Sequence, residues 1–239
     1  MLTLKKSLMG IFGILMLVVL SSGCVGSGSG NVVKEARDVS GFNQISVDGN
    51  INLILKQGDV ESVEVEAEDN IISNIKTQVT GNKLEIKQEG TSMIWPSKPI
   101  NVYVTVKDIN SIEISGSSNV KSSAIDTDNL DLSISGSGAA EIENLTAKNL
   151  KAKISGAGKI ELSGTIQKQD ITIEGSGDYK ARYLKSEDTV ITINGSGNTE
   201  VNTSKNLEIN ITGSGKVSYL GNPKIKQNIS GSGDIKKLS

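Results

Sequence analysis

The stretch "LDLSISGSGAAEIENL" (residues 130–145) alternates apolar and polar side chains, stops at Gly-Ser-Gly, and then alternates again. A degenerate copy, "ISGSS", precedes it at 114–118, and further copies follow as "ISGAG" (154–158), "IEGSG" (173–177), "INGSG" (193–197), "ITGSG" (211–215) and "ISGSG" (229–233). The first glycines of successive copies are 20, 20, 19, 20, 18 and 18 residues apart. Such a period is typical of a stacked repeat architecture.

An isoleucine stands two positions before the first glycine of every copy, and the position before that isoleucine is always polar. This two-residue alternation is that of a β-strand with one buried face. Because the strands recur in one direction with no helical segment between them, they predict a right-handed parallel β-helix, an all-β single domain with coils stacked about 4.8 Å apart. The predicted core ladder is Ile114, Ile134, Ile154, Ile173, Ile193, Ile211 and Ile229.

The glycines are predicted to form corners between two sides of each coil, because glycine adopts positive φ without steric penalty. A phosphate-binding loop is the functional alternative, but it needs a helix directly after the glycines, whereas most copies continue as strand. The predicted structural turn glycines are Gly136, Gly138, Gly156, Gly158, Gly175, Gly177, Gly195, Gly197, Gly213, Gly215, Gly231 and Gly233.

The N-terminal segment has the features of an export signal. Lys5 and Lys6 precede an apolar run at 8–20, and "LSSGC" ends at Cys24, the single cysteine. This resembles a lipobox, although Leu20 lies one position further from the cysteine than the usual pattern. We expect a lipoprotein signal peptide (1–23), lipidation of Cys24, and a Gly/Ser tether (24–30). These features predict an exported, lipid-anchored chain on the outer face of a prokaryotic membrane or at the cell surface. An ordinary secretory signal or an N-terminal anchor helix is the alternative.

Residues 31–110 also alternate, but on a less regular period, and we expect irregular coils there before the regular repeats of 111–239. "FNQISVDGNINLILKQG" (42–58), "VEVEAEDNI" (63–71), "LEIKQ" (84–88) and the serial Gly-Ser-Gly turns resemble the family of putative autotransporter adhesin heads, or GIN domains. The resemblance spans about residues 38–236. It implies a right-handed β-helix on an exported, often lipid-anchored protein, and it implies no catalytic residues.

Composition narrows the function classes. The chain has no histidine, which excludes histidine-dependent triads and imidazole metal sites, and its net charge of −2 argues against nucleic-acid binding. Glu141 and Glu161 are the candidate catalytic carboxylates of a β-helical carbohydrate-active enzyme, but they more often belong to a solvated face. The "GSGD" copies at Asp178 and Asp234 resemble calcium-binding β-roll turns without matching their nine-residue period. We therefore expect no catalytic, metal or cofactor site.

The favoured function is an anchored, non-enzymatic surface module for adhesion, binding or structure, with a surface polymer, a carbohydrate or a protein as ligand. A polysaccharide lyase or hydrolase is the alternative, and an envelope sensor or accessory protein is a third. A homodimer formed through an exposed end of the β-helix is a further alternative. Trp95, the single tryptophan, is predicted to cover the core and is alternatively a ligand contact.

Overall fold

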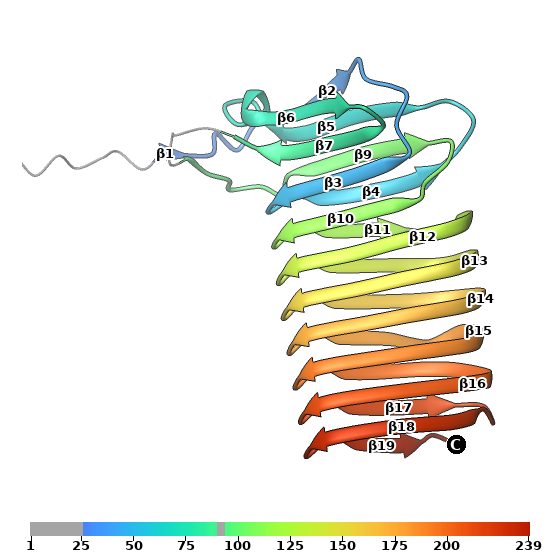
Figure 1. The fold of residues 1–239 in the computed structure, drawn as a ribbon. Helices are drawn as coiled ribbons and strands as arrows, with labels where there is room; N and C mark the ends of the chain where they lie inside the picture. The colour runs from blue at the N-terminus through green and yellow to red at the C-terminus, as the bar shows by residue number, and fades with distance from the viewer. Residues whose placement is uncertain (1–25, 90–93) are drawn as a thin grey trace, which may run out of the picture.

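The computed structural model describes residues 26–89 and 94–239. From Ser111 onward the chain winds into coils whose strands lie parallel to those one coil away (Figure 1). The all-β parallel solenoid is therefore confirmed. Its strands are β10 (Ser111–Gly116), β11 (Asn119–Ser122), β12 (Ile125–Gly136), β13 (Ala139–Gly156), β14 (Lys159–Gly175), β15 (Asp178–Gly195), β16 (Asn198–Gly213), β17 (Lys216–Leu220), β18 (Lys224–Gly231) and β19 (Asp234–Lys237).

Equivalent residues of successive coils stand in register. Ile134 pairs with Ile114 on one side and with Ile154 on the other, and the same register brings the first glycines together from Gly116 to Gly231. Six of the ladder isoleucines are buried, whereas Ile229 is 38% exposed because no further coil covers it. Burial of an isoleucine contributes about 1.5–3 kcal/mol, so stacking supplies stability that a single coil lacks.

The two glycines of a turn meet different requirements. The first glycine of each turn has positive φ, +123° at Gly156 for example, whereas the second glycine does not. The second is required by close packing, because a Cβ at Gly158 would lie 2.6 Å from Cγ2 of Ile134 in the previous coil. The corner and the isoleucine ladder are thus one packing unit.

The first coil begins earlier than the repeats indicate. Gly49 at the end of β3 (Gln44–Gly49) pairs with Gly116, and Ile45 and Val47 extend the isoleucine columns. After β4 (Asn52–Gln57) the chain leaves the coil and returns to it at Ser111. The elements of this part are β1 (Gly26–Ser27), β2 (Val32–Arg37), β3 (Gln44–Gly49), β4 (Asn52–Gln57), β5 (Ser62–Glu68), the 3₁₀ turn η1 (Ile72–Asn74), β6 (Ile75–Thr80), β7 (Lys83–Gln88), β8 (Ile94–Trp95) and β9 (Asn101–Val106).

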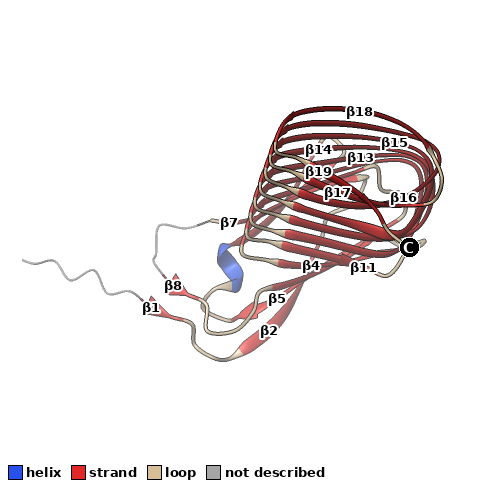
Figure 2. Cartoon of the chain, turned by 90° about the horizontal axis from the view of Figure 1, so that it is seen from below, coloured by secondary structure: helices blue, strands red, loops and turns tan. Residues whose placement is uncertain are grey.

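The segment that leaves the coil caps its end. β7 and β9 pair in parallel with β3 and β4, and β5, β2 and β6 then add antiparallel strands beyond them. Much of 31–110, expected as irregular coils, therefore differs from a coil. Antiparallel strands can be joined by short turns and cover the N-terminal edges of the solenoid. Viewed along the stack, β1, β8 and η1 lie outside the outline of the coils (Figure 2).

The last coil ends the stack at the opposite end (Figure 1). Ile225 and Ile229 are 42% and 38% exposed there, and Lys236 and Lys237 stand on the final strand β19. Exposed strand edges are where β proteins associate, and lysines oppose such pairing. A homodimer through this end stays a prediction.

Candidate functional site

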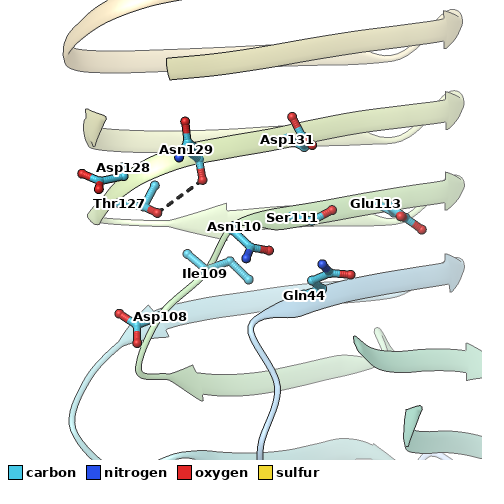
Figure 3. Close-up of a pocket in the computed structure, with 10 residues that line it drawn as sticks. All are labelled: Gln44, Asp108, Ile109, Asn110, Ser111, Glu113, Thr127, Asp128, Asn129 and Asp131. Atoms are coloured by element: carbon cyan, nitrogen blue, oxygen red, sulfur yellow. Dashed lines mark hydrogen bonds between the residues drawn. The ribbon is translucent and has the colours of Figure 1, made fainter. Parts of the chain in front are cut away.

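A shallow cleft of about 630 Å³ opens on the side of the solenoid where the chain re-enters the coil from the cap (Figure 3). The loop after β9 and the strands β3, β10 and β12 form its walls, so the cleft depends on stacking of segments distant in sequence. Its lining is mainly polar: Gln44, Asp108, Ile109, Asn110, Ser111, Glu113, Thr127, Asp128, Asn129 and Asp131.

A second hollow of about 190 Å³ continues the first along the stack, because both are lined by Asn129 and Asp131. It reaches the next two coils through Asn149, Lys151, Lys168 and Asp170, and the buried Leu130 and Leu150 form its apolar base. We call the two hollows together the side groove. The groove runs parallel to the solenoid axis across several coils, so its polar groups recur at the spacing of the strands.

Amide and charged side chains order the surface of the side groove. The Asn149 side-chain amide donates to Oδ1 of Asn129 at 2.9 Å, and the hydroxyl of Thr127 donates to the Asn129 carbonyl oxygen. Lys83 lies 2.8 Å from Glu113, and Lys148 lies 2.8 Å from Asp128.

The first hollow has four carboxylates in its lining, whereas the second mixes Lys151 and Lys168 with Asp131 and Asp170. The N-terminal half of the side groove is therefore the more acidic half. It disfavours a polyanion and favours neutral hydroxyl-rich or basic groups.

The candidate catalytic pair lies outside the side groove. Glu141 and Glu161 are paired neighbours on adjacent strands, as expected, but Glu141 lies 2.8 Å from Lys121 and Glu161 lies 2.5 Å from Lys159. The hydrogen bond from Lys159 holds the pKa of Glu161 below its usual value. A glycosidase acid needs a raised pKa, so Glu161 lacks that property.

One of the two candidate calcium positions makes a side-chain contact within the protein. Asp178 accepts a hydrogen bond of 2.8 Å from the Asn198 side chain, and Asp234 lies in the last coil. Within 26–89 and 94–239, no group of three acidic or cysteine side chains is arranged to hold a metal ion.

The predicted lipidation site, Cys24, lies outside the described residues, as does the signal peptide. The described part of the predicted tether makes specific contacts. β1 pairs in parallel with β8, and the N–H of Gly30 donates to the carboxylate of Glu68 at 2.7 Å. In the part of the chain that the structure describes, no helix is long and apolar enough to cross a membrane.

Glu68 is a central residue that sequence reasoning missed. Alternation along β5 places its side chain outward, yet it is only 1% exposed. Besides the Gly30 N–H, its carboxylate accepts the Ser97 hydroxyl at 2.5 Å, the Ser97 N–H at 2.8 Å and the Lys98 N–H at 3.3 Å. We call this arrangement the Glu68 clasp; it joins residues 26–30 and 95–98 to β5. The hydrogen bond from the Ser97 hydroxyl contributes most to lowering the Glu68 pKa.

Trp95 does not cover the core. Its side chain is 70% exposed, so the predicted packing role is wrong and the contact role remains. The Glu68 clasp holds the Trp95 backbone at the surface. There the Trp95 carbonyl oxygen accepts the Gly28 N–H at 2.9 Å.

The comparisons with known proteins agree with the architecture. The model of the family described as "Putative auto-transporter adhesin, head GIN domain" matches residues 41–223. The chain belongs to this family. Membership of this family supports surface adhesion or binding as the general class of function. A search of curated proteins finds no match.

Solved structures of similar chains support the same fold. A putative adhesin from Bacteroides fragilis is 25% identical, with a TM-score of 0.85 and coverage of 89% of this chain and 99% of that one. A putative adhesin from Parabacteroides distasonis is 25% identical, with a TM-score of 0.75 and the same coverage. A structure from the same species described as a putative lipid binding protein is 24% identical, with a TM-score of 0.73, covers the same shares of the two chains, and shows the fold alone.

Proposed function

We propose that this GIN-domain protein is a lipid-anchored, non-enzymatic surface module whose side groove binds an extended partner. The single observation that carries the proposal is the continuity of the groove across coils, through Asn129 and Asp131. Lipidation of Cys24 supplies the anchor, and export of the chain follows from the signal segment before it.

The groove offers a repeated set of contacts rather than one deep pocket. Amide groups at Asn129 and Asn149 stand opposite each other on two successive coils, so a polymer lying along the axis meets the same group on both. Solenoids commonly use such long surfaces for extended ligands. The acidic half of the groove favours a neutral glycan or a basic protein segment over an anionic polysaccharide.

Binding of the purified mature chain to glycan and peptide arrays and to intact cell envelopes tests the proposal. Removal of both amides, in Asn129→Ala with Asn149→Ala, is expected to weaken binding about tenfold, because each hydrogen bond contributes about 0.5–1.5 kcal/mol. Asn198→Ala is the matched control, since Asn198 also donates to its neighbour in the previous coil but lies outside the groove. Absence of binding to every array and envelope, or equal binding by both variants, contradicts the proposal.

The enzyme alternative makes a separate prediction. A lyase or hydrolase would release reducing ends from acidic polysaccharides, and Glu141→Gln or Glu161→Gln would abolish that release. Because both carboxylates pair with lysines and the pKa of Glu161 is lowered, we expect no release by the wild-type chain.

A further inference from the structure

We propose that Trp95 inserts into the headgroup region of the membrane to which the chain is anchored. The proposal rests on lipidation of Cys24, which belongs to the function proposed above. It adds a second membrane contact, made by a side chain that lies far from Cys24 in the sequence.

Strand pairing brings Trp95 next to the segment that follows Cys24 in the sequence. Ser27 of β1 stands opposite Trp95 of β8, and the Gly28 N–H donates to the Trp95 carbonyl oxygen at 2.9 Å. Cys24 is three residues before Ser27, so the two are separated by about 10 Å at most. A lipid on Cys24 therefore holds the bilayer surface within reach of the Trp95 side chain.

The Glu68 clasp fixes this neighbourhood to the cap. One carboxylate accepts hydrogen bonds from Gly30, just after β1, and from Ser97 and Lys98, just after Trp95. A side chain at Gly28 would collide with the same carboxylate, so the segment lies directly against it. Because both segments are held, Trp95 keeps its position relative to the anchored end.

The chemistry of the exposed side chains suits a lipid interface. Tryptophan combines a large apolar ring with one N–H donor and is enriched at membrane–water boundaries. Trp95 is 70% exposed, and Lys98 supplies a positive charge for anionic lipid headgroups. Asp69 is the nearby exposed carboxylate, and it accepts hydrogen bonds from Ser29 and Asn31 at 2.5 and 2.9 Å.

This contact would orient the solenoid. β1 and β8 lie beside the capped end, and the coils stack away from it towards the C-terminal strand β19 (Figure 1). With the anchor and Trp95 both at the membrane, the capped end is proximal and the last coil projects outward. The side groove then stays accessible to a partner outside the cell.

Intrinsic fluorescence tests the proposal directly, because Trp95 is the single tryptophan of the chain. The full chain is produced in a bacterium that lipidates exported proteins and is reconstituted in vesicles of phosphatidylethanolamine and phosphatidylglycerol. Mass spectrometry of the N-terminal peptide establishes whether Cys24 carries lipid. Compared with the chain without vesicles, we expect Trp95 emission in vesicles to lie at shorter wavelength and to be quenched much less by acrylamide. We also expect lipids brominated near the headgroup to quench it.

A matched control moves the reporter away from the membrane. In Trp95→Phe with Tyr183→Trp, the tryptophan replaces a side chain that is 75% exposed on β15. It is expected to stay accessible to acrylamide and insensitive to brominated lipid. Equal quenching at positions 95 and 183 on a lipidated chain overturns the membrane contact and leaves the binding function of the groove standing. An unmodified Cys24 overturns the anchor and the contact together.

Discussion

Gly156 packs against the carbonyl oxygen of Gly136 in the preceding coil so closely that a Cβ on Gly156 would lie 2.5 Å from that oxygen. The same oxygen accepts the N–H of Ala157 at 2.9 Å, so it cannot move away without weakening a hydrogen bond between coils. The corner therefore demands glycine for two reasons: the backbone has φ of +123°, and the neighbouring coil leaves no room.

Gly156→Ala is expected to lower the free energy of unfolding by about 3 kcal/mol, the sum of backbone strain and overpacking. Gly81→Ala is the control, because Gly81 also has positive φ, +64°, but a Cβ there meets nothing within 4 Å. That change should reduce stability by about 1 kcal/mol. Denaturant unfolding followed by circular dichroism measures both values, and equal effects would contradict the close approach of the corners.

Ile173→Asp is expected to lower the free energy of unfolding by more than about 4 kcal/mol, because Ile173 is fully buried and the new carboxylate would have no partner. Ile229→Asp places the same change at the same ladder position of the last coil, where the side chain is 38% exposed. Its effect should stay under about 1 kcal/mol. Thermal unfolding of the two variants compares them, and a stable Ile173→Asp protein would refute the buried ladder.

Gln169 interrupts an apolar column and forms a hydrogen-bonded network inside the core. Tyr179 donates to its side-chain oxygen at 2.7 Å, and its amide donates to Ser186 and Thr189 at 3.0 and 3.1 Å. Gln169→Leu is expected to reduce stability by about 2 kcal/mol, because it leaves the buried Tyr179 hydroxyl without a partner.

Removing the Tyr179 hydroxyl as well should recover part of that loss. Adding Tyr179→Phe to Gln169→Leu removes the orphaned hydroxyl, while Ser186 keeps its bond to the Asn202 carbonyl oxygen at 2.9 Å and Thr189 keeps its bond to Thr203 at 2.6 Å. Urea unfolding of the two single variants and of the double variant gives the coupling energy. Purely additive losses would show that the network contributes no cooperative stabilisation.

Acid is expected to release the N-terminal segment by protonating Glu68. Its pKa is lowered in the folded protein from 4.5, first by the Ser97 hydroxyl and then by backbone N–H groups. A lowered folded pKa stabilises the clasp above the unfolded pKa, and this stabilisation is lost as pH falls through the folded pKa. The protection of the Gly30 and Ser97 amides against hydrogen exchange, relative to the intrinsic rate at each pH, should therefore fall as the pH drops below the unfolded Glu pKa of about 4.3.

Two variants separate Glu68 from its neighbours. Glu68→Gln should lower this protection already at neutral pH and remove most of the pH dependence of the protection. Glu66 also has a lowered pKa, chiefly through a hydrogen bond from Asn101, but it does not contact residues 26–30. Glu66→Gln should therefore leave exchange at Gly30 unchanged, and fast exchange there would assign the pH effect to general loosening of the cap. Asp69, with a pKa lowered mainly by the hydrogen bond from Asn31, adds a second acid response in the same segment.

The repeats made the solenoid predictable because one physical pattern recurs in every coil. Alternation around Ile154 and the glycine at 156 specify a strand and a corner locally, and a period of 18–20 residues specifies the stacking. The first coil escaped prediction because Gly49 and Gly116 are separated by the inserted cap, although they pair directly. The antiparallel strands of the cap have the same alternation as coils, and alternation alone does not distinguish the two directions.

The candidate site was less predictable than the fold. The side groove is formed by the loop after β9 together with strands from several coils, and no short sequence motif identifies it. The Glu68 clasp is hidden for the same reason, since its donors at Gly30 and Ser97 come from two distant segments. Trp95 is the single tryptophan of the sequence, but its exposure depends on how residues 26–30 and 95–98 lie against β5.

The amino-acid order determined the winding, because each coil repeats short-range steric rules for glycine and short-range alternation of isoleucine with polar residues. Tertiary structure alone decided the cap, the side groove and the clasp. Those features arise where segments with no shared pattern come into contact, and the energy of such contacts depends on distances and hydrogen-bond geometry that linear spacing does not encode.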